Sequence, residues 1–131
     1  MTSVRLHVDA IVALLAASNL AAYVGEAPDD LSTPYVVLYP TPGFPVAESL
    51  KAPNSDIVVD FQLTCVGKTA EQALWLHDQA RAAVDHVTPT VSGRTCWPIY
   101  ADELPQPIRR DDQVNPPLFV AISRWSLRST T

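Results

Sequence analysis

Two adjoining stretches near the middle of the chain differ in the periodicity of their hydrophobic and polar residues. From Asp56 to Val66 the residues alternate, which is typical of a half-buried β-strand. Its expected buried side consists of Ile57, Val59, Phe61, Leu63 and Cys65. After Gly67-Lys68, apolar residues recur at helical spacing from Ala70 to Val87, with Thr69 placed to cap the helix together with Gln72. The pattern predicts a long strand, a tight turn and a long helix.

The N-terminal segment is expected to form an amphipathic helix. It is predicted to start at a cap formed by Thr2 or Ser3 and to end near Ser18-Asn19. Its apolar stripe consists of Val4, Val8, Ile11, Val12 and Leu15. His7 lies one turn from Ile11, and we expect a partly buried or edge histidine rather than a ligand.

Shorter strands are expected before and after the central pair of elements. The predicted segments are Leu20 to Val24, Pro34 to Pro40, Arg94 to Tyr100 and, as the last and longer strand, Leu118 to Arg128. Pro98 should make the third of these an edge strand or a bulge, because proline cannot donate to a β-ladder. Thr88-Pro89 is expected to stop the long helix.

Two proline-rich stretches, at about residues 41–55 and 101–117, are expected to be long, extended loops. The first contains Phe44, Val46 and Leu50, which could fold back on the core or form an arm that packs on a neighbouring molecule. The second carries the positive charges of Arg109 and Arg110. These five residues are the candidates for a subunit interface.

The order of elements predicts a single α+β domain over residues 1–131. We expect a two-layer sandwich, with a mostly antiparallel sheet of four to five strands and two helices packed on one face. The composition, 47% hydrophobic and 18% charged, is that of an ordinary globular protein. No segment has the length or composition of a membrane span or secretion signal, so no membrane partner is expected.

Charge and cysteine content limit the possible partners. The net charge of −5 argues against binding to a nucleic-acid backbone, which requires clustered Lys and Arg. Cys65 is expected on the inward side of its strand and Cys96 precedes Trp97, and both are interpreted as reduced core thiols.

No residue pattern points to catalysis, a cofactor or a metal. His77 and Asp78 are adjacent and therefore point in different directions on a helix, and His86 lies farther along the chain. Cys65 is expected to be inert, and Ser92 lacks a nucleophile-elbow pattern. Carboxylate pairs occur only in polar loops, at Asp29-Asp30, Asp102-Glu103 and Asp111-Asp112. We therefore expect an interaction or structural role rather than an enzyme.

The order and length of the elements resemble those of the tail terminator and tail completion proteins of long-tailed (siphovirus- or myovirus-like) bacteriophages. The features that carry the resemblance are the N-terminal amphipathic helix, Pro34-Tyr35-Val36-Val37-Leu38, the alternating strand from Asp56 to Val66, Thr69-Ala70-Glu71-Gln72-Ala73 at a helix start, and a closing strand. They cover most of the chain and include no signature residue.

The resemblance implies a structural virion protein in the neck region of a phage tail, present in the host cytoplasm during assembly. Proteins of this family form a hexameric ring that caps the tail tube, stops its elongation and joins the tail to the head connector. The implied partners are other copies of the chain, the tail tube protein and the head-tail connector or stopper protein. DNA would only pass through the lumen, and the acidic net charge suits this because it repels phosphate.

Two alternatives remain open. The chain could be another neck component, such as a head-tail connector or stopper. It could instead be a small cytoplasmic ligand-binding or enzymatic domain with a pocket between helix and sheet around Trp75, His77 and Tyr100.

Overall fold

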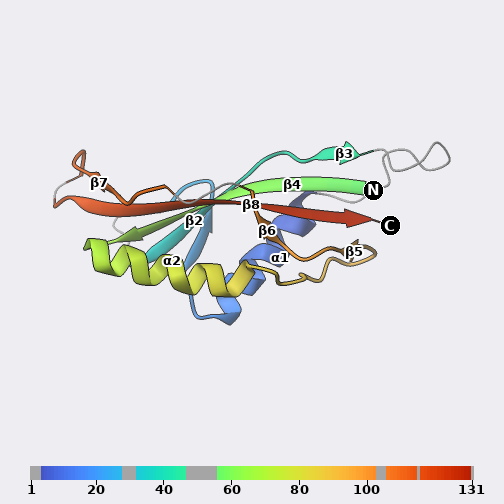
Figure 1. Ribbon diagram of the computed structural model, residues 1–131, viewed down its shortest axis with the longest axis horizontal. Coiled ribbons are helices and arrows are strands. Elements are labelled where there is room, and N and C mark those ends of the chain that lie inside the picture. The colour runs from blue at the N-terminus through green and yellow to red at the C-terminus, as the bar shows by residue number, and fades with distance from the viewer. Residues whose placement is uncertain (1–3, 28–31, 47–55, 103–105, 115, 131) are drawn as a thin grey trace.

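Two long antiparallel strands, β4 (Asp56–Gly67) and β8 (Leu118–Thr130), form the centre of the sheet in this computed structural model (Figure 1). The structure describes residues 4–27, 32–46, 56–102, 106–114 and 116–130, and of residues 44–46 only the backbone. Phe61 of β4 lies opposite Trp125 of β8, in a register that runs without interruption along both strands. The alternation predicted for residues 56–66 is confirmed from Val59 to Cys65, where the odd-numbered residues are buried. At the start of the strand it is wrong, because Ile57 is half-buried and Asp56 is buried.

Short strands flank β4 on its outer side. β2 (Tyr35–Pro40) and β3 (Phe44–Val46) both pair antiparallel with β4, and β1 (Ala22–Val24) pairs parallel with β2. Between β2 and β3, residues 41–43 face only residues 59–60 of β4, an offset of one residue. An extra residue of this kind bends the strand that contains it.

The outer side of β8 is divided in the same way. β5 (Thr95–Cys96), β6 (Tyr100–Ala101) and β7 (Arg109–Asp111) each pair antiparallel with a different part of β8. The pairing is again offset by one residue between β5 and β6, where Pro98 lies. The prediction of an edge strand or bulge at Pro98 is therefore confirmed.

The prediction that residues 41–55 and 101–117 are loops without regular structure is wrong in part. β3 lies in the first stretch, and Ala101 of β6 and all of β7 lie in the second. Pro45 is tolerated because β3 pairs with β4 on one side only among the described residues, and an edge strand does not need every N–H group for the ladder.

Two helices, α1 (Val4–Ala17) and α2 (Ala70–Val84), cover one face of the sheet (Figure 1). Within the described residues the main sheet order is β1-β2-β4-β8-β5, and every pairing except that of β1 with β2 is antiparallel. The α+β two-layer sandwich is confirmed. Its fully buried core side chains include Ile11, Leu15, Val36, Leu38, Val59, Leu63, Cys65, Ala73, Val84, Ile99 and Leu127.

α1 ends where the sequence predicts, in a Schellman motif. Asn19 has a left-handed backbone (φ 59°), and the N–H of Leu20 donates to the carbonyl of Leu15 at 3.1 Å. The N–H of Asn19 donates to Ala16 at 2.9 Å, so two carbonyls of the last turn are satisfied. The predicted cap at Thr2 or Ser3 lies outside the described residues.

α2 starts as predicted but ends earlier. The Thr69 hydroxyl accepts from the Gln72 N–H at 3.1 Å, which caps the first turn. The helix ends at Val84 and not at Val87, because His86 adopts φ 60° and its N–H donates to the carbonyl of Ile99 at 2.7 Å. This contact with a distant segment stops the helix before Thr88-Pro89 is reached.

Gly67 joins β4 to α2 where no side chain fits. A Cβ atom at this position would lie 2.5 Å from the backbone nitrogen of Ala73 and 3.0 Å from its Cα. Gly67→Ala is therefore expected to lower the free energy of unfolding by about 1–3 kcal/mol, because backbone must shift to relieve the clash. Urea denaturation would measure this loss, and an unchanged midpoint would contradict the close approach of α2 to the end of β4.

A buried polar cluster joins the start of α1 to the end of β8. His7 is fully buried, and its Nε2 lies 2.7 Å from Ser129 Oγ, which also accepts from Arg94 Nε at 2.8 Å. Next to it, Arg128 donates through Nη2 and Nε to one carboxylate oxygen of Asp56, at 2.7 and 3.1 Å. The expectation of a partly buried or edge His7 is corrected by this hydrogen-bonded burial.

Candidate functional site

The predicted interface residues of the first proline-rich stretch lie at or beyond a sheet edge. Phe44 and Val46 belong to β3, opposite Val58 and Asp56 of β4, and the structure describes their backbone only. Leu50 lies outside the described residues. Their role in a subunit interface stays a prediction.

Arg109 and Arg110 lie in β7, which forms a hairpin with β8. Arg110 Nε is 2.6 Å from Asp112 Oδ1, and both side chains are more than half exposed. The local pairing that the sequence left open is thus present at Arg110. An exposed pair of this kind contributes little to stability, so it does not prevent Arg110 from contacting another molecule.

Several large apolar side chains are exposed that the sequence analysis did not assign to an interface. Leu74 and Trp75 of α2 are each 52% exposed, although both lie in a predicted core helix. They fall outside the apolar stripe formed by Ala73, Leu76 and Ala80, and this is the signal that could have identified them. Exposed aromatic residues are often the main contributors to protein–protein contacts.

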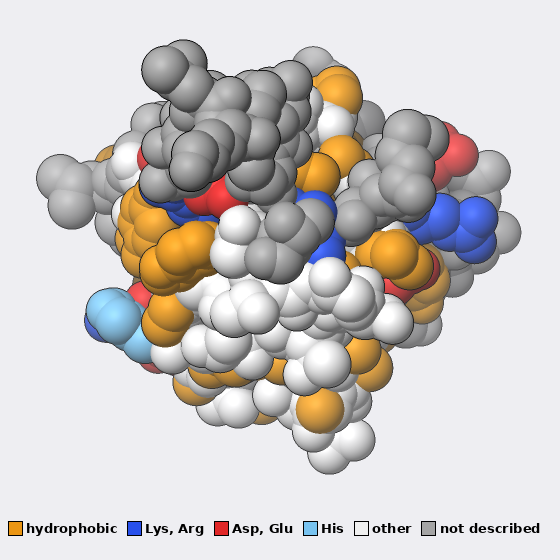
Figure 2. All heavy atoms as spheres, turned by 90° about the vertical axis from the view of Figure 1, so that its right-hand side faces the viewer, with side chains coloured by type: hydrophobic (Ala, Val, Ile, Leu, Met, Phe, Trp, Pro, Cys, Tyr) orange, Lys and Arg blue, Asp and Glu red, His pale blue; other side chains and the backbone are white. Residues whose placement is uncertain are grey.

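A second exposed aromatic group lies beside the outer side of β8. Trp97 and Tyr100 line a shallow depression of about 370 Å³ together with His86, Pro98, Ile99 and Arg128. The Arg128 guanidinium lies 5.2 Å from the centre of the Trp97 ring, a cation–π contact. On the end of the molecule where β3, β5 and both termini lie, Figure 2 shows hydrophobic side chains gathered near a histidine.

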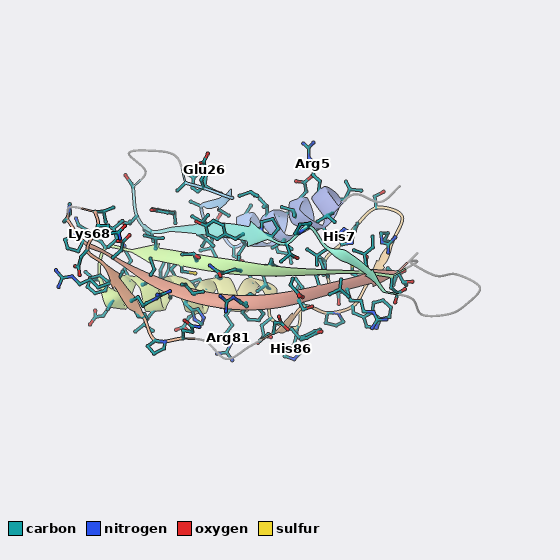
Figure 3. All side chains as sticks on the ribbon, turned by 90° about the horizontal axis from the view of Figure 1, so that it is seen from above. Arg5, His7, Glu26, Lys68, Arg81 and His86 are labelled. Atoms are coloured by element: carbon teal, nitrogen blue, oxygen red, sulfur yellow. The ribbon has the colours of Figure 1, made fainter. Side chains whose placement is uncertain are left out.

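The face of the sheet opposite the helices is not covered by any described helix (Figure 3). Tyr39 is 42% exposed there, whereas Val37 of the same strand is 3% exposed. Tyr23 and Tyr35 pack edge to face, with ring centres 6.4 Å apart. Burial raises the pKa of the Tyr35 hydroxyl, with Tyr39 and Asp111 adding to the shift. This face therefore combines apolar and hydroxyl groups.

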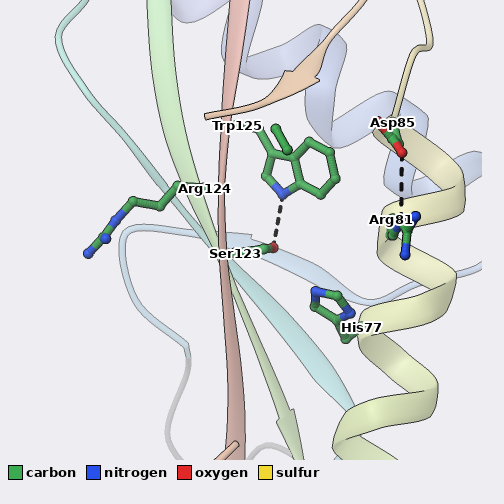
Figure 4. A pocket seen from close by; sticks show the side chains of 7 residues that line it. His77, Arg81, Asp85, Ser123, Arg124 and Trp125 are labelled. Atoms are coloured by element: carbon green, nitrogen blue, oxygen red, sulfur yellow. Dashed lines mark hydrogen bonds and ion pairs between the residues drawn. The ribbon is translucent and has the colours of Figure 1, made fainter. Parts of the chain in front are cut away.

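A pocket of about 200 Å³ lies between α2 and β8 (Figure 4). It is lined by His77 and Arg81 of α2, by Asp85 just after the helix, by Ala101, and by Ser123, Arg124 and Trp125 of β8. The hypothesis of a pocket around Trp75, His77 and Tyr100 is confirmed for His77 alone. Trp75 is 52% exposed and Tyr100 lines the other depression, because the opposite wall is built by β8, which is distant in sequence.

His77 presents an unsatisfied nitrogen to the interior. Its side chain is 14% exposed, and its Nε2 is buried with no hydrogen-bond partner in the described part of the chain. Its Nδ1 lies 4.0 Å from Asp78 Oδ1. Burial lowers the pKa of His77, Asp78 opposes this shift and Arg81 adds to it. The shift favours the neutral form of the ring.

The other polar groups of the pocket are largely paired with one another. Trp125 Nε1 donates to Ser123 Oγ at 2.9 Å, and Arg81 Nε lies 3.6 Å from Asp85 Oδ2. Figure 4 shows the Arg124 side chain extending away from the space that His77 and Ser123 share. The interior is thus neutral, with an imidazole and a hydroxyl beside an indole ring.

The cysteines do not offer a reactive site. Burial raises the pKa of the Cys65 thiol to about 12, so this thiol is protonated at neutral pH. Burial also raises the pKa of Cys96, which is partly exposed, and both cysteines are free.

The described residues include no group of three His, Cys, Asp or Glu side chains arranged to hold a metal. No helix among them has the length and apolar character needed to cross a membrane.

Comparison with known proteins gives a likeness in fold. Neither a scan against family models nor a search of curated proteins finds a match. Among solved structures, the fold is similar to that of a chain in the virion of a native gene transfer agent (GTA) particle. The TM-score is 0.61 at 16% sequence identity, over 98% of this chain and 92% of that chain. The two chains therefore share a fold along nearly their whole lengths.

Proposed function

We propose that this protein is a structural component of a phage-like virion, and that it closes the end of the tail tube as a ring and joins the tail to the head connector. The observation that carries the proposal is the shared fold with a chain of a gene transfer agent virion, which extends over 98% of this chain. The order of elements supports the narrower tail-terminator role, because it resembles that of tail terminator proteins.

The surface of the protein supports self-association. A ring needs contact surfaces on two sides of each subunit, and this chain exposes aromatic residues both on α2 and beside β8. The net charge of −5 per copy suits a lumen through which DNA passes without binding. In this role the chain acts without a cofactor and is not an enzyme.

The test combines light scattering over a range of protein concentrations with negative-stain images of the protein mixed with tail tubes. Rings, or particles attached at one end of each tube, are the expected result. Attachment to isolated head connectors but not to tubes would overturn the terminator role in favour of another neck position. A monomer that ignores both tubes and connectors would overturn the proposal as a whole.

Phe44→Asp is expected to leave the monomer folded and to impair ring formation. β3 pairs with β4 on one side only among the described residues, which leaves its outer edge open to another copy of the chain. A charged side chain on this strand would destabilise such a contact, because the charge would have to be desolvated. Light scattering measures assembly, and circular dichroism confirms the fold of the variant.

Val114→Asp serves as a control for Phe44→Asp, because Val114 is also exposed, at 40%, but lies in the β7–β8 turn at the opposite end of the molecule (Figure 1). Equal loss of assembly in both variants would contradict a specific role for β3. An unfolded Phe44→Asp monomer would mean that Phe44 belongs to the core.

A further inference from the structure

The pocket between α2 and β8 holds polar groups that the proposed ring does not use. His77 Nε2 is buried without a described hydrogen-bond partner, and an unsatisfied buried nitrogen destabilises the folded protein. Proteins retain few such groups, and a bound molecule is one way to satisfy them. The volume of about 200 Å³ is large enough for a group of several heavy atoms.

The hydrogen-bonding character of the pocket follows from its neighbours. Asp78 Oδ1 lies 4.0 Å from Nδ1, too far for a hydrogen bond, and its negative charge favours the proton of neutral His77 on Nδ1. Nε2 is then an acceptor directed into the pocket. Ser123 Oγ already accepts from Trp125 Nε1, which leaves the hydroxyl hydrogen as a donor. The pocket thus presents one acceptor and one donor.

The charge of the pocket excludes an ion as its best ligand. Arg81 lies 3.6 Å from Asp85, which leaves no net charge from this pair, and Arg124 extends away from the cavity (Figure 4). Trp125 and Ala101 provide an apolar surface beside the polar groups. A matching ligand is uncharged, donates and accepts through neighbouring atoms, and carries a short apolar stem.

We propose that this pocket binds a primary carboxamide. Its NH₂ group donates to His77 Nε2, its carbonyl accepts from the Ser123 hydroxyl, and its aliphatic stem packs on the Trp125 ring. The carboxamide belongs either to a small free molecule or to an asparagine or glutamine side chain of a second copy of this chain. The second source rests on the proposed ring, whereas the binding chemistry does not.

The test is an NMR titration of the purified protein with propionamide, with propionate as the isosteric charged control. The resonances observed are the His77 imidazole and the Trp125 indole N–H. Saturable shifts of both signals are expected with propionamide, and affinity for propionate should be at least about tenfold lower, because the carboxylate cannot donate to Nε2. Absence of saturation, or equal affinity for the two compounds, would overturn the proposal.

Variants test whether propionamide binds in this pocket or elsewhere on the molecule. His77→Leu should abolish propionamide binding, observed through Trp125, whereas His77→Gln should retain it because its side-chain oxygen can accept. Leu74→Gln is the control, because Leu74 is 52% exposed on the same helix and does not line this pocket. Binding retained in His77→Leu with a native spectrum, or lost in Leu74→Gln, would refute the assignment.

Dilution of the protein without added ligand distinguishes the two sources. Shifts of the His77 and Trp125 signals with protein concentration would assign the carboxamide to a second copy, and constant signals would assign it to a free molecule. Tube-end attachment is scored separately by microscopy. Loss of carboxamide binding and loss of capping are therefore distinguishable failures.

Discussion

Phe61→Ala is expected to lower the free energy of unfolding by about 3–5 kcal/mol. Phe61 is 2% exposed, and on β4 it faces the helical layer opposite Trp125 of β8. Removing the ring leaves a cavity between the sheet and the helical layer, which the sheet cannot close because β4 and β8 are held by an uninterrupted ladder. Urea or guanidinium denaturation measures the loss as a lower midpoint at constant slope.

Phe119→Ala is a matched control for the Phe61 variant. Phe119 is only partly buried at the edge of the same core, so its removal should cost less than that of Phe61. A loss below about 1 kcal/mol for Phe61→Ala would show that the faces of β4 are reversed.

Arg128→Met is expected to destabilise the protein by about 3–5 kcal/mol, because it removes the two charge-assisted hydrogen bonds that Arg128 donates to the buried Asp56 carboxylate. Asp56 is 1% exposed and accepts two hydrogen bonds from Arg128, at 2.7 and 3.1 Å. Methionine keeps much of the packing volume of the arginine stem. The measured cost therefore reports mainly on the ion pair and on the lost contact with Trp97.

The double variant Asp56→Leu/Arg128→Met measures the interaction between these two side chains. Buried ion pairs can often be replaced by apolar residues without loss, so the double variant should be more stable than Arg128→Met alone. Denaturation of the two single variants and the double variant yields the coupling energy. Strict additivity would contradict a direct interaction between the two side chains.

The sequence predicts those elements whose structure is determined by local periodicity. β4 and α2 could be predicted from the alternation of residues 56–66 and from the capped helical pattern that starts at Ala70. Burial on one face of a strand or helix imposes its own period on the sequence. Pro34 and Pro40 likewise delimit β2 closely, since proline interrupts a ladder.

Features determined by distant partners could not be predicted in this way. β3 and β7 are extended because β4 and β8 supply hydrogen bonds, and their own proline-rich surroundings indicate loops. The early end of α2 depends on hydrogen bonds with Ile99. For the pocket, the sequence identified His77 but not Ser123 or Trp125, because strand pairing and helix packing bring β8 to this position.

The broken flanks of the sheet have a consequence for the behaviour of the protein at high concentration. An exposed, continuous edge strand is a template on which other chains can add strands without limit. Here the outer sides of β4 and β8 carry short strands interrupted by one-residue offsets and by Pro45 or Pro98. No flank described offers a long, straight row of free N–H and C=O groups. We expect concentrated solutions to resist fibril formation, so that association is left to side-chain contacts of defined geometry.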